Sequence, residues 1–228
     1  PKGVLNFITG RAGEIGPAIT EPPVIRAISF TGSTTAGEQI CRAVGFITRT
    51  QMELGGKNPL IVMDDADLDQ AVDLAIKGGL SLAGQACTGT SRVLVMKQVR
   101  SEFTARLLAR VQAIKIGSGL TSGMEMGPLA TARQLETVLR YVAIGKAEAM
   151  HLHGGDRLTG AGYDGGYFVS PAIFTDVTQE MTIAREEIFG PVIAIIEVES
   201  YADAIAKANA SEYGLSAAIV TRNPRVMH

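Results

Sequence analysis

The sequence of 228 residues is poor in cysteine, in excess charge and in long apolar runs, and each shortage removes a class of protein. Its two cysteines, Cys41 and Cys87, form neither a CxxC pair nor a dense framework, which argues against a disulfide scaffold and a structural zinc site. Lys and Arg number 21 against 23 Asp and Glu, so no charge excess indicates nucleic acid or a membrane surface as partner. Apolar runs such as 192–196 are far shorter than the roughly 20 residues that cross a bilayer. We therefore expect a cytoplasmic protein that acts on a small molecule.

The sequence opens with Pro1 in place of methionine, and residues 2–8 look like the interior of a protein. We therefore expect an internal fragment, truncated at both ends. With 46% hydrophobic residues, its length is still enough to bury a sizeable core.

Strand and helix patterns alternate along the whole chain. The β-prone runs 4–8 and 26–30 are each followed by a glycine turn and a segment with helical spacing, the second at 34–47. After Glu53 the alternation restarts, with strands expected at 59–63, 92–96, 192–198 and 216–221, a helix start at 64–67, and helices around 103–114, 135–142 and 201–209. This alternation predicts a doubly wound α/β architecture.

Cys87 lies in the polar segment 84–92, after a predicted helix. An isolated cysteine is more often a small buried hydrophobe. The neighbours Gln85, Thr88 and Thr90 favour a reactive thiol instead. A thiolate here could attack an aldehyde carbonyl to form a thiohemiacetal, whose hydrogen leaves as hydride and whose sulfur remains in a thioester.

Glu53 lies 34 positions before Cys87, in the segment Met-Glu-Leu-Gly-Gly-Lys-Asn. Alone, it could be a solvated surface carboxylate. The following Gly55 and Gly56 allow the backbone to come close to a ligand or to adopt positive φ values. Glu53 is therefore a candidate general base.

Gly32 and Ser33 begin a predicted helix directly after a strand. Free N–H groups and the helix dipole at such a position can bind a pyrophosphate, although Thr-Gly-Ser-Thr is also a common helix cap. Gly10, Gly13 and Gly16 differ from the GxGxxG fingerprint, and we interpret them as a turn.

Four segments, at 30–33, 52–58, 84–92 and 186–192, together resemble the active-site signatures of the NAD(P)-dependent aldehyde dehydrogenase superfamily. The resemblance covers the central part of longer family members. It implies that residues 1–53 are the C-terminal part of a Rossmann-like NAD(P)-binding domain. Residues 54–228 would then be an incomplete α/β catalytic domain that carries the thiol.

The resemblance also implies a role for each site residue. Cys87 would be the nucleophile, and its backbone N–H would be one oxyanion donor. Glu53 would activate the water that hydrolyses the thioester, which favours the acid-producing branch over members that acylate coenzyme A. The cofactor-binding residues would be Gly32, Ser33, Leu54, Glu187 and Phe189, with Glu187 on the nicotinamide ribose and Phe189 near the nicotinamide ring.

Without the resemblance, residues 185–192 would have a structural role, as a charged helix end followed by a Gly-Pro turn.

The resemblance also implies two residues upstream of Pro1. They are an asparagine that acts as the second oxyanion donor and a lysine that contacts the cofactor. No metal is expected, because His151 and His153 have no acidic or cysteine ligand beside them.

The sequence thus predicts oxidation of an aldehyde to a carboxylic acid with NAD or NADP. The run 53–67 is most similar to the semialdehyde branch, which includes enzymes for succinate and 2-oxoglutarate semialdehydes. We expect a homodimer or homotetramer without nucleic-acid or membrane partners, and an inactive fragment when the chain is alone. Two alternatives stay open: a catalytically silent, truncated or repurposed member of the fold with a structural or interaction role, and a cysteine hydrolase without a redox cofactor.

Overall fold

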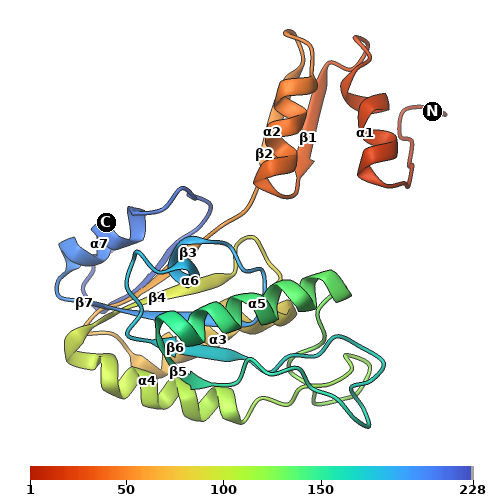
Figure 1. The fold of residues 1–228 in the computed structure, drawn as a ribbon. Helices are drawn as coiled ribbons and strands as arrows, with labels where there is room; N and C mark the ends of the chain where they lie inside the picture. Colours follow the sequence, from red (N-terminus) through yellow and green to blue (C-terminus); the bar gives the residue numbers. More distant parts are fainter. Residues whose placement is uncertain (227–228) are drawn as a thin grey trace. The chain divides into compact units, whose positions relative to one another are not determined.

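The computed structural model describes residues 1–226 and divides the chain into two compact units, Pro1–Gly55 and Gly56–His228. Both units combine helices with parallel strands (Figure 1), so the predicted α/β class is confirmed. Within the described residues, no helix is both long enough and apolar enough to cross a membrane.

The first unit is a single β-α-β crossover preceded by one helix. Its elements are α1 (Ala12–Thr20), β1 (Ala27–Thr31), α2 (Thr34–Ala43) and β2 (Arg49–Glu53). Strands β1 and β2 are parallel, with Thr31 opposite Glu53. The helix α2 begins after Ser33, whose Oγ accepts a hydrogen bond from the N–H of Ala36.

Three local predictions for this unit need correction. The strand expected at 4–8 is absent, and the side chains of Leu5 and Phe7 are 91% and 89% exposed. A strand needs a partner for its backbone groups, and no segment pairs with residues 4–8 in the described part of the chain. The helix expected to reach residue 47 ends at Ala43, because Val44 is extended. Strand β2 was not predicted, since its sequence RTQME has no apolar pattern.

The second unit contains a six-stranded sheet in the order β5-β6-β7-β4-β3-β8. All neighbouring strands are parallel except β5, which runs antiparallel to β6. The strands are β3 (Asn58–Val62), β4 (Thr90–Met96), β5 (Met150–His153), β6 (Ala172–Thr175), β7 (Val192–Val198) and β8 (Ala218–Val220). Four of the six were predicted, whereas β5 and β6 were not.

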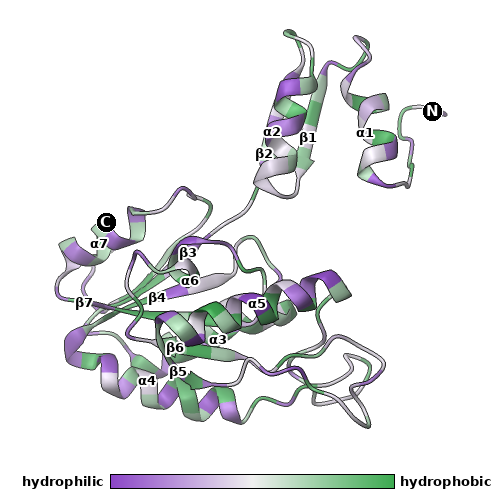
Figure 2. Ribbon diagram, viewed as in Figure 1, coloured by the Kyte–Doolittle hydropathy of each residue, from purple (hydrophilic) through white to green (hydrophobic). Residues whose placement is uncertain are grey.

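Helices cover both faces of this sheet and close its core. They are α3 (Leu68–Leu80), the short η1 (Ser81–Gly84), α4 (Lys97–Gln112), α5 (Ala132–Glu148), α6 (Thr182–Arg185) and α7 (Tyr201–Asn209). The crossovers β3-α3-β4 and β7-α7-β8 run in opposite directions across the sheet, so right-handed connections place α3 and α7 on opposite faces. Strand β7 is hydrophobic and buried along nearly its whole length (Figure 2), whereas β4 begins with the polar residues 90–92 and is apolar and buried over residues 93–96.

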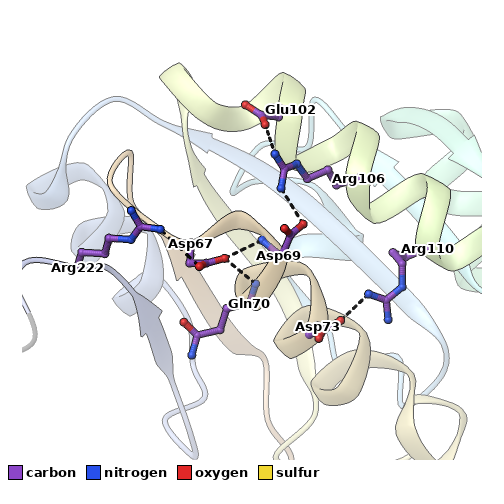
Figure 3. A network of polar contacts seen from close by, with 8 residues as sticks. All are labelled: Asp67, Asp69, Gln70, Asp73, Glu102, Arg106, Arg110 and Arg222. Atoms are coloured by element: carbon purple, nitrogen blue, oxygen red, sulfur yellow. Dashed lines mark hydrogen bonds and ion pairs between the residues drawn. The ribbon is translucent and has the colours of Figure 1, made fainter.

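Helices α3 and α4 also interact through a polar network on their outer surface (Figure 3). Asp67 caps α3 by accepting from the N–H groups of Asp69 and Gln70, and these bonds hold the pKa of its carboxyl below the ordinary value. Arg106 pairs with Asp69 at 2.7 Å and Arg110 with Asp73 at 2.6 Å. Exposed ion pairs of this kind contribute little stability each.

Candidate active site

The amino ends of four neighbouring strands carry the motif residues of the second unit. Strands β7, β4, β3 and β8 are adjacent and mutually parallel, so their amino ends lie at one edge of the sheet. Cys87 precedes β4, Glu187 and Phe189 precede β7, Asn58 begins β3, and Ser216 precedes β8. Sheet topology therefore collects segments that are up to 158 residues apart in sequence.

Cys87 is half-buried and follows a sharp left-handed turn. Leu82, Ala83 and Gly84 have φ values of 54°, 55° and 70°, a conformation that costs free energy for the two residues that have a Cβ. Gln85 stabilises the turn, because its amide donates to the carbonyl of Leu82 at 2.9 Å and accepts from the N–H of Ala130 at 2.8 Å. The turn ends the helical segment abruptly and brings the thiol to the sheet edge.

Segment 56–58 connects the thiol loop to Glu187. The N–H of Gly56 donates to Oε1 of Glu187 at 3.0 Å. The amide of Asn58 donates to the carbonyl oxygens of Cys87 and Gly89 at 2.7 and 2.9 Å. Two residues of the glycine motif, Gly56 and Asn58, thus contact the Glu187 segment and the thiol loop of this unit.

Glu187 is half-buried, and Phe189 is 39% exposed. Phe189 has a φ of 55°, in the left-handed region that large side chains avoid. The amide of Gln134 on α5 compensates for this strain by donating to the carbonyls of Ile188 and Phe189 at 2.9 and 2.8 Å. Nearby, Tyr141 donates to Glu186 at 2.6 Å. The Glu187–Phe189 segment is therefore fixed from α5 and from the glycine motif.

Two cations are buried beneath this edge. Arg92 donates to the carbonyls of Lys57, Lys207 and Ala208, which satisfies the end of α7. The Lys57 side chain is 2% exposed, and its Nζ has no hydrogen-bond partner among the described residues. Burial, reinforced by the charge of Arg92 and opposed by Glu187 and Glu186, lowers the pKa of Lys57 to about 7.

The predicted site residues of the first unit form a second group. Gly32, Ser33 and Glu53 are exposed and lie at the carboxyl ends of β1 and β2, where the N–H of Gly32 donates to the carbonyl of Glu53 at 3.0 Å. Leu54 is half-buried, and its side chain packs on Gly37 of α2. Predicted residues are thus brought together in two groups, one in each unit.

The comparisons with known proteins agree with these signatures. The sequence model of the aldehyde dehydrogenase family matches residues 1–228. The chain belongs to the aldehyde dehydrogenase family.

An alpha-ketoglutaric semialdehyde dehydrogenase of Bacillus subtilis is 46% identical over 225 residues, which are 98% of this chain and 46% of that protein. Betaine aldehyde dehydrogenase of Staphylococcus aureus, solved with NAD+, has a TM-score of 0.96 at 36% identity, over all of this chain and 46% of that one. An NAD-dependent aldehyde dehydrogenase of Sinorhizobium meliloti has a TM-score of 0.95 at 37% identity, over 99% and 45% of the two chains. This aldehyde dehydrogenase chain thus spans about half the length of its relatives.

Several residues that organise this candidate site were not predicted from the sequence. Asn58 and Lys57 stand inside the quoted glycine motif, but no role was predicted for them. The contacts of Arg92 and Gln134 could not be predicted from sequence, because their partners are backbone carbonyls that lie far away along the chain. His151 has a structural environment, with Nε2 at 2.8 Å from the carbonyl of Gly154 and its ring against Phe174.

Proposed function

We propose that the full-length protein containing this chain oxidises an aldehyde to the carboxylic acid with NAD or NADP. The observation that carries the proposal is the Cys87 loop. It presents a half-buried thiol at a sheet edge where Asn58, Gly56 and Glu187 converge, within a chain that belongs to the aldehyde dehydrogenase family. The bonds from Asn58 hold the backbone carbonyls of Cys87 and Gly89, so they fix the peptide groups beside the thiol.

In the first half-reaction, the Cys87 thiolate attacks the aldehyde carbon. A C–S bond forms, and the π electrons of the carbonyl move to oxygen, where the N–H of Cys87 would stabilise the charge. Bound NAD(P)+ would supply the acceptor for the hydride that leaves this carbon. As the carbonyl forms again, Cys87 is left as a thioester.

In the second half-reaction, Glu53 serves as general base. It takes a proton from water as the water oxygen attacks the thioester carbonyl, and the C–S bond then breaks to release the acid and the Cys87 thiolate. The overall change consumes one aldehyde, one water and one oxidised cofactor, and yields one acid, one reduced cofactor and one proton.

The residues proposed for the cofactor suit its chemistry. Gly32 and Ser33 start a ten-residue helix, whose N-terminal N–H groups and dipole favour a pyrophosphate. The Glu187 carboxylate, held through Oε1 by Gly56, is an acceptor that matches ribose hydroxyls. Relatives with this fold have been solved with NAD+ and, in 3,6-anhydro-L-galactose dehydrogenase, with NAP.

For the substrate, we propose a semialdehyde of a 2-oxo acid. The support is the similarity to the Bacillus subtilis alpha-ketoglutaric semialdehyde dehydrogenase. A dicarboxylic semialdehyde would then be preferred over betaine aldehyde and over an uncharged alkyl aldehyde of equal length.

The test is NAD(P)H formation by the full-length protein with these three aldehydes, with wild type beside Cys87→Ala. We expect the semialdehyde to give the highest kcat/KM. We expect Cys87→Ala to lower turnover by about a thousandfold or more, while cofactor affinity stays unchanged. Ester cleavage without reduction of NAD(P)+ would support a cysteine hydrolase, and no turnover of either kind would support the silent alternative.

A further inference from the structure

The Asn58 side chain is buried, with 4% exposure, at the start of β3, between the thiol loop and the entry to β8. Both the NH2 group and the oxygen of its side-chain amide form hydrogen bonds. Nδ2 donates to the carbonyls of Cys87 and Gly89, and Oδ1 accepts from the N–H of Ser216 at 3.0 Å. One side chain thus joins the amino ends of β3, β4 and β8.

The two bonds from Nδ2 restrict the orientation of the thiol loop. Peptide groups are planar, so fixing the carbonyls of Cys87 and Gly89 also fixes the directions of the N–H groups of Thr88 and Thr90. The backbone on the C-terminal side of the Cys87 Cα is thereby tied to the central sheet. The strained turn at 82–84 and Gln85 restrict the other side. Together these contacts fix the backbone on both sides of Cys87, and with it the direction of the Cα–Cβ bond that carries the thiol.

Gly56 makes the contact possible. A Cβ built on Gly56 would overlap the carbonyl oxygen of Cys87 and would lie 2.9 Å from both polar atoms of the Asn58 amide. The space is therefore reserved for the amide and the two carbonyls. This explains the glycine at position 56 by close approach, since its φ is not in the left-handed region.

We propose that Asn58 is a positioning residue for the Cys87 thiol. Its two N–H bonds to the carbonyls of Cys87 and Gly89 orient the nucleophile for attack, and Asn58 itself contacts no substrate. This inference rests on the proposed role of Cys87 as nucleophile. Asn58 thereby gains a role in a motif where the sequence predicted roles for Glu53, Leu54 and the glycines.

The test is Asn58→Asp in the full-length protein. This change preserves shape and the acceptor for Ser216, but it places a carboxylate against two carbonyl oxygens. The matched control is Thr221→Ala, which removes a buried hydroxyl bonded at 2.8 Å to Asp65, at the carboxyl end of β8. Both changes cost stability, but only the first should disturb the thiol.

Two readouts separate positioning from stability. The first is the rate of Cys87 alkylation by iodoacetamide across pH, followed by peptide mass spectrometry because Cys41 is exposed and reacts too. The second is the pre-steady-state burst of NAD(P)H. We expect Asn58→Asp to shift the alkylation profile to higher pH and to slow the burst on the order of 100-fold, with an unchanged KM for NAD(P)+. Thr221→Ala should keep wild-type values for both.

If Asn58→Asp fails to fold, the milder Asn58→Ser takes its place. Serine retains one hydrogen-bond donor, so its alkylation and burst rates should be intermediate between those of the wild type and those expected for Asn58→Asp. Wild-type alkylation and burst rates in a folded Asn58→Asp or Asn58→Ser variant would overturn the proposal. The alkylation rate does not depend on dehydrogenase chemistry. If the wild type reduced no NAD(P)+ but alkylation still slowed in Asn58→Asp, the proposed function would fail while the positioning role stood.

Discussion

The two units of this chain differ in how completely each forms a core. In Pro1–Gly55 no hydrophobic side chain is buried among the described residues, whereas the buried hydrophobic residues extend from Leu60 to Val220 in the second unit. The first unit has two strands, and the second has a six-stranded sheet with helices on both faces. A two-stranded sheet with one crossover helix encloses too little apolar surface for independent stability. Within this chain, only the second unit therefore has a buried apolar core.

The units also present their candidate residues at opposite kinds of sheet edge. Gly32, Ser33 and Glu53 follow the carboxyl ends of β1 and β2, the usual ligand position in an open α/β sheet. Cys87 and Glu187 precede the amino ends of β4 and β7. In the proposed reaction, the nucleophile Cys87 therefore belongs to the second unit. The proposed base Glu53 and the proposed phosphate-binding residues belong to the first unit.

Among these predictions, Glu53→Gln should give the largest effect, because it separates the proposed base of the first unit from the nucleophile of the second. The effect is on the rate of thioester hydrolysis. Hydride transfer needs only the Cys87 adduct, so it should proceed at the wild-type rate. Hydrolysis of the thioester loses its base and should slow by about 100-fold or more. Rapid mixing should show a burst of NAD(P)H followed by slow turnover. A trace without a burst, with hydride formation itself slowed to the steady rate, would remove Glu53 from the hydrolytic role.

Gly84→Ala tests how strictly the second unit is packed. Gly84 has a φ of 70°, and a Cβ there would overlap the carbonyl oxygen of Gly190. Strain and overlap together should reduce the free energy of unfolding by about 3 kcal/mol or more. The control is Gly165→Ala in the same unit, where a Cβ meets no atom within 4 Å. Urea unfolding should show equal midpoints for wild type and control, and a similar midpoint for Gly84→Ala would mean that this turn relaxes easily.

Lys57→Met should change how stability depends on pH. The pKa of Lys57 is lowered from 10.5 to about 7 in the folded unit. Between these values the unfolded chain binds a proton that the folded chain does not, so wild-type stability rises with pH through this window. Below about pH 7 both states are protonated, and the cost of burying the charge is fully present.

The methionine variant has no such charge to bury. It should be more stable than wild type by a few kcal/mol near pH 7, and the difference should shrink toward pH 10. Urea midpoints measured at several pH values test this. A difference that is constant with pH would mean that Lys57 is charged and compensated in the folded state.

Sequence alone predicted those elements whose signal is local. The apolar run at 192–198 and the helix at 201–209 have the predicted bounds, and a strand buried on both faces is recognisable in sequence as a continuous apolar run. Strands β2, β5 and β6 were missed, since they are short and depend on their partners for stability. Cys87 was singled out from its polar neighbours, and its role stays a prediction. Asn58 was not, because the carbonyls that define its role lie 29 and 31 residues away.

The smallest expected effect comes from Gly13→Ala in the first unit. Gly13 lies in α1, its φ is outside the left-handed region, and a Cβ there meets no atom within 4 Å. Alanine should therefore favour the helix by up to about 1 kcal/mol, through a smaller entropy loss on folding. Hydrogen exchange should slow in α1, which has no buried residue, and stay unchanged in β4 and β7, which belong to the buried core of the other unit. Faster exchange in α1 would show that Gly13 packs against something in solution, and the contrast between a unit without a buried core and a unit with one would no longer hold.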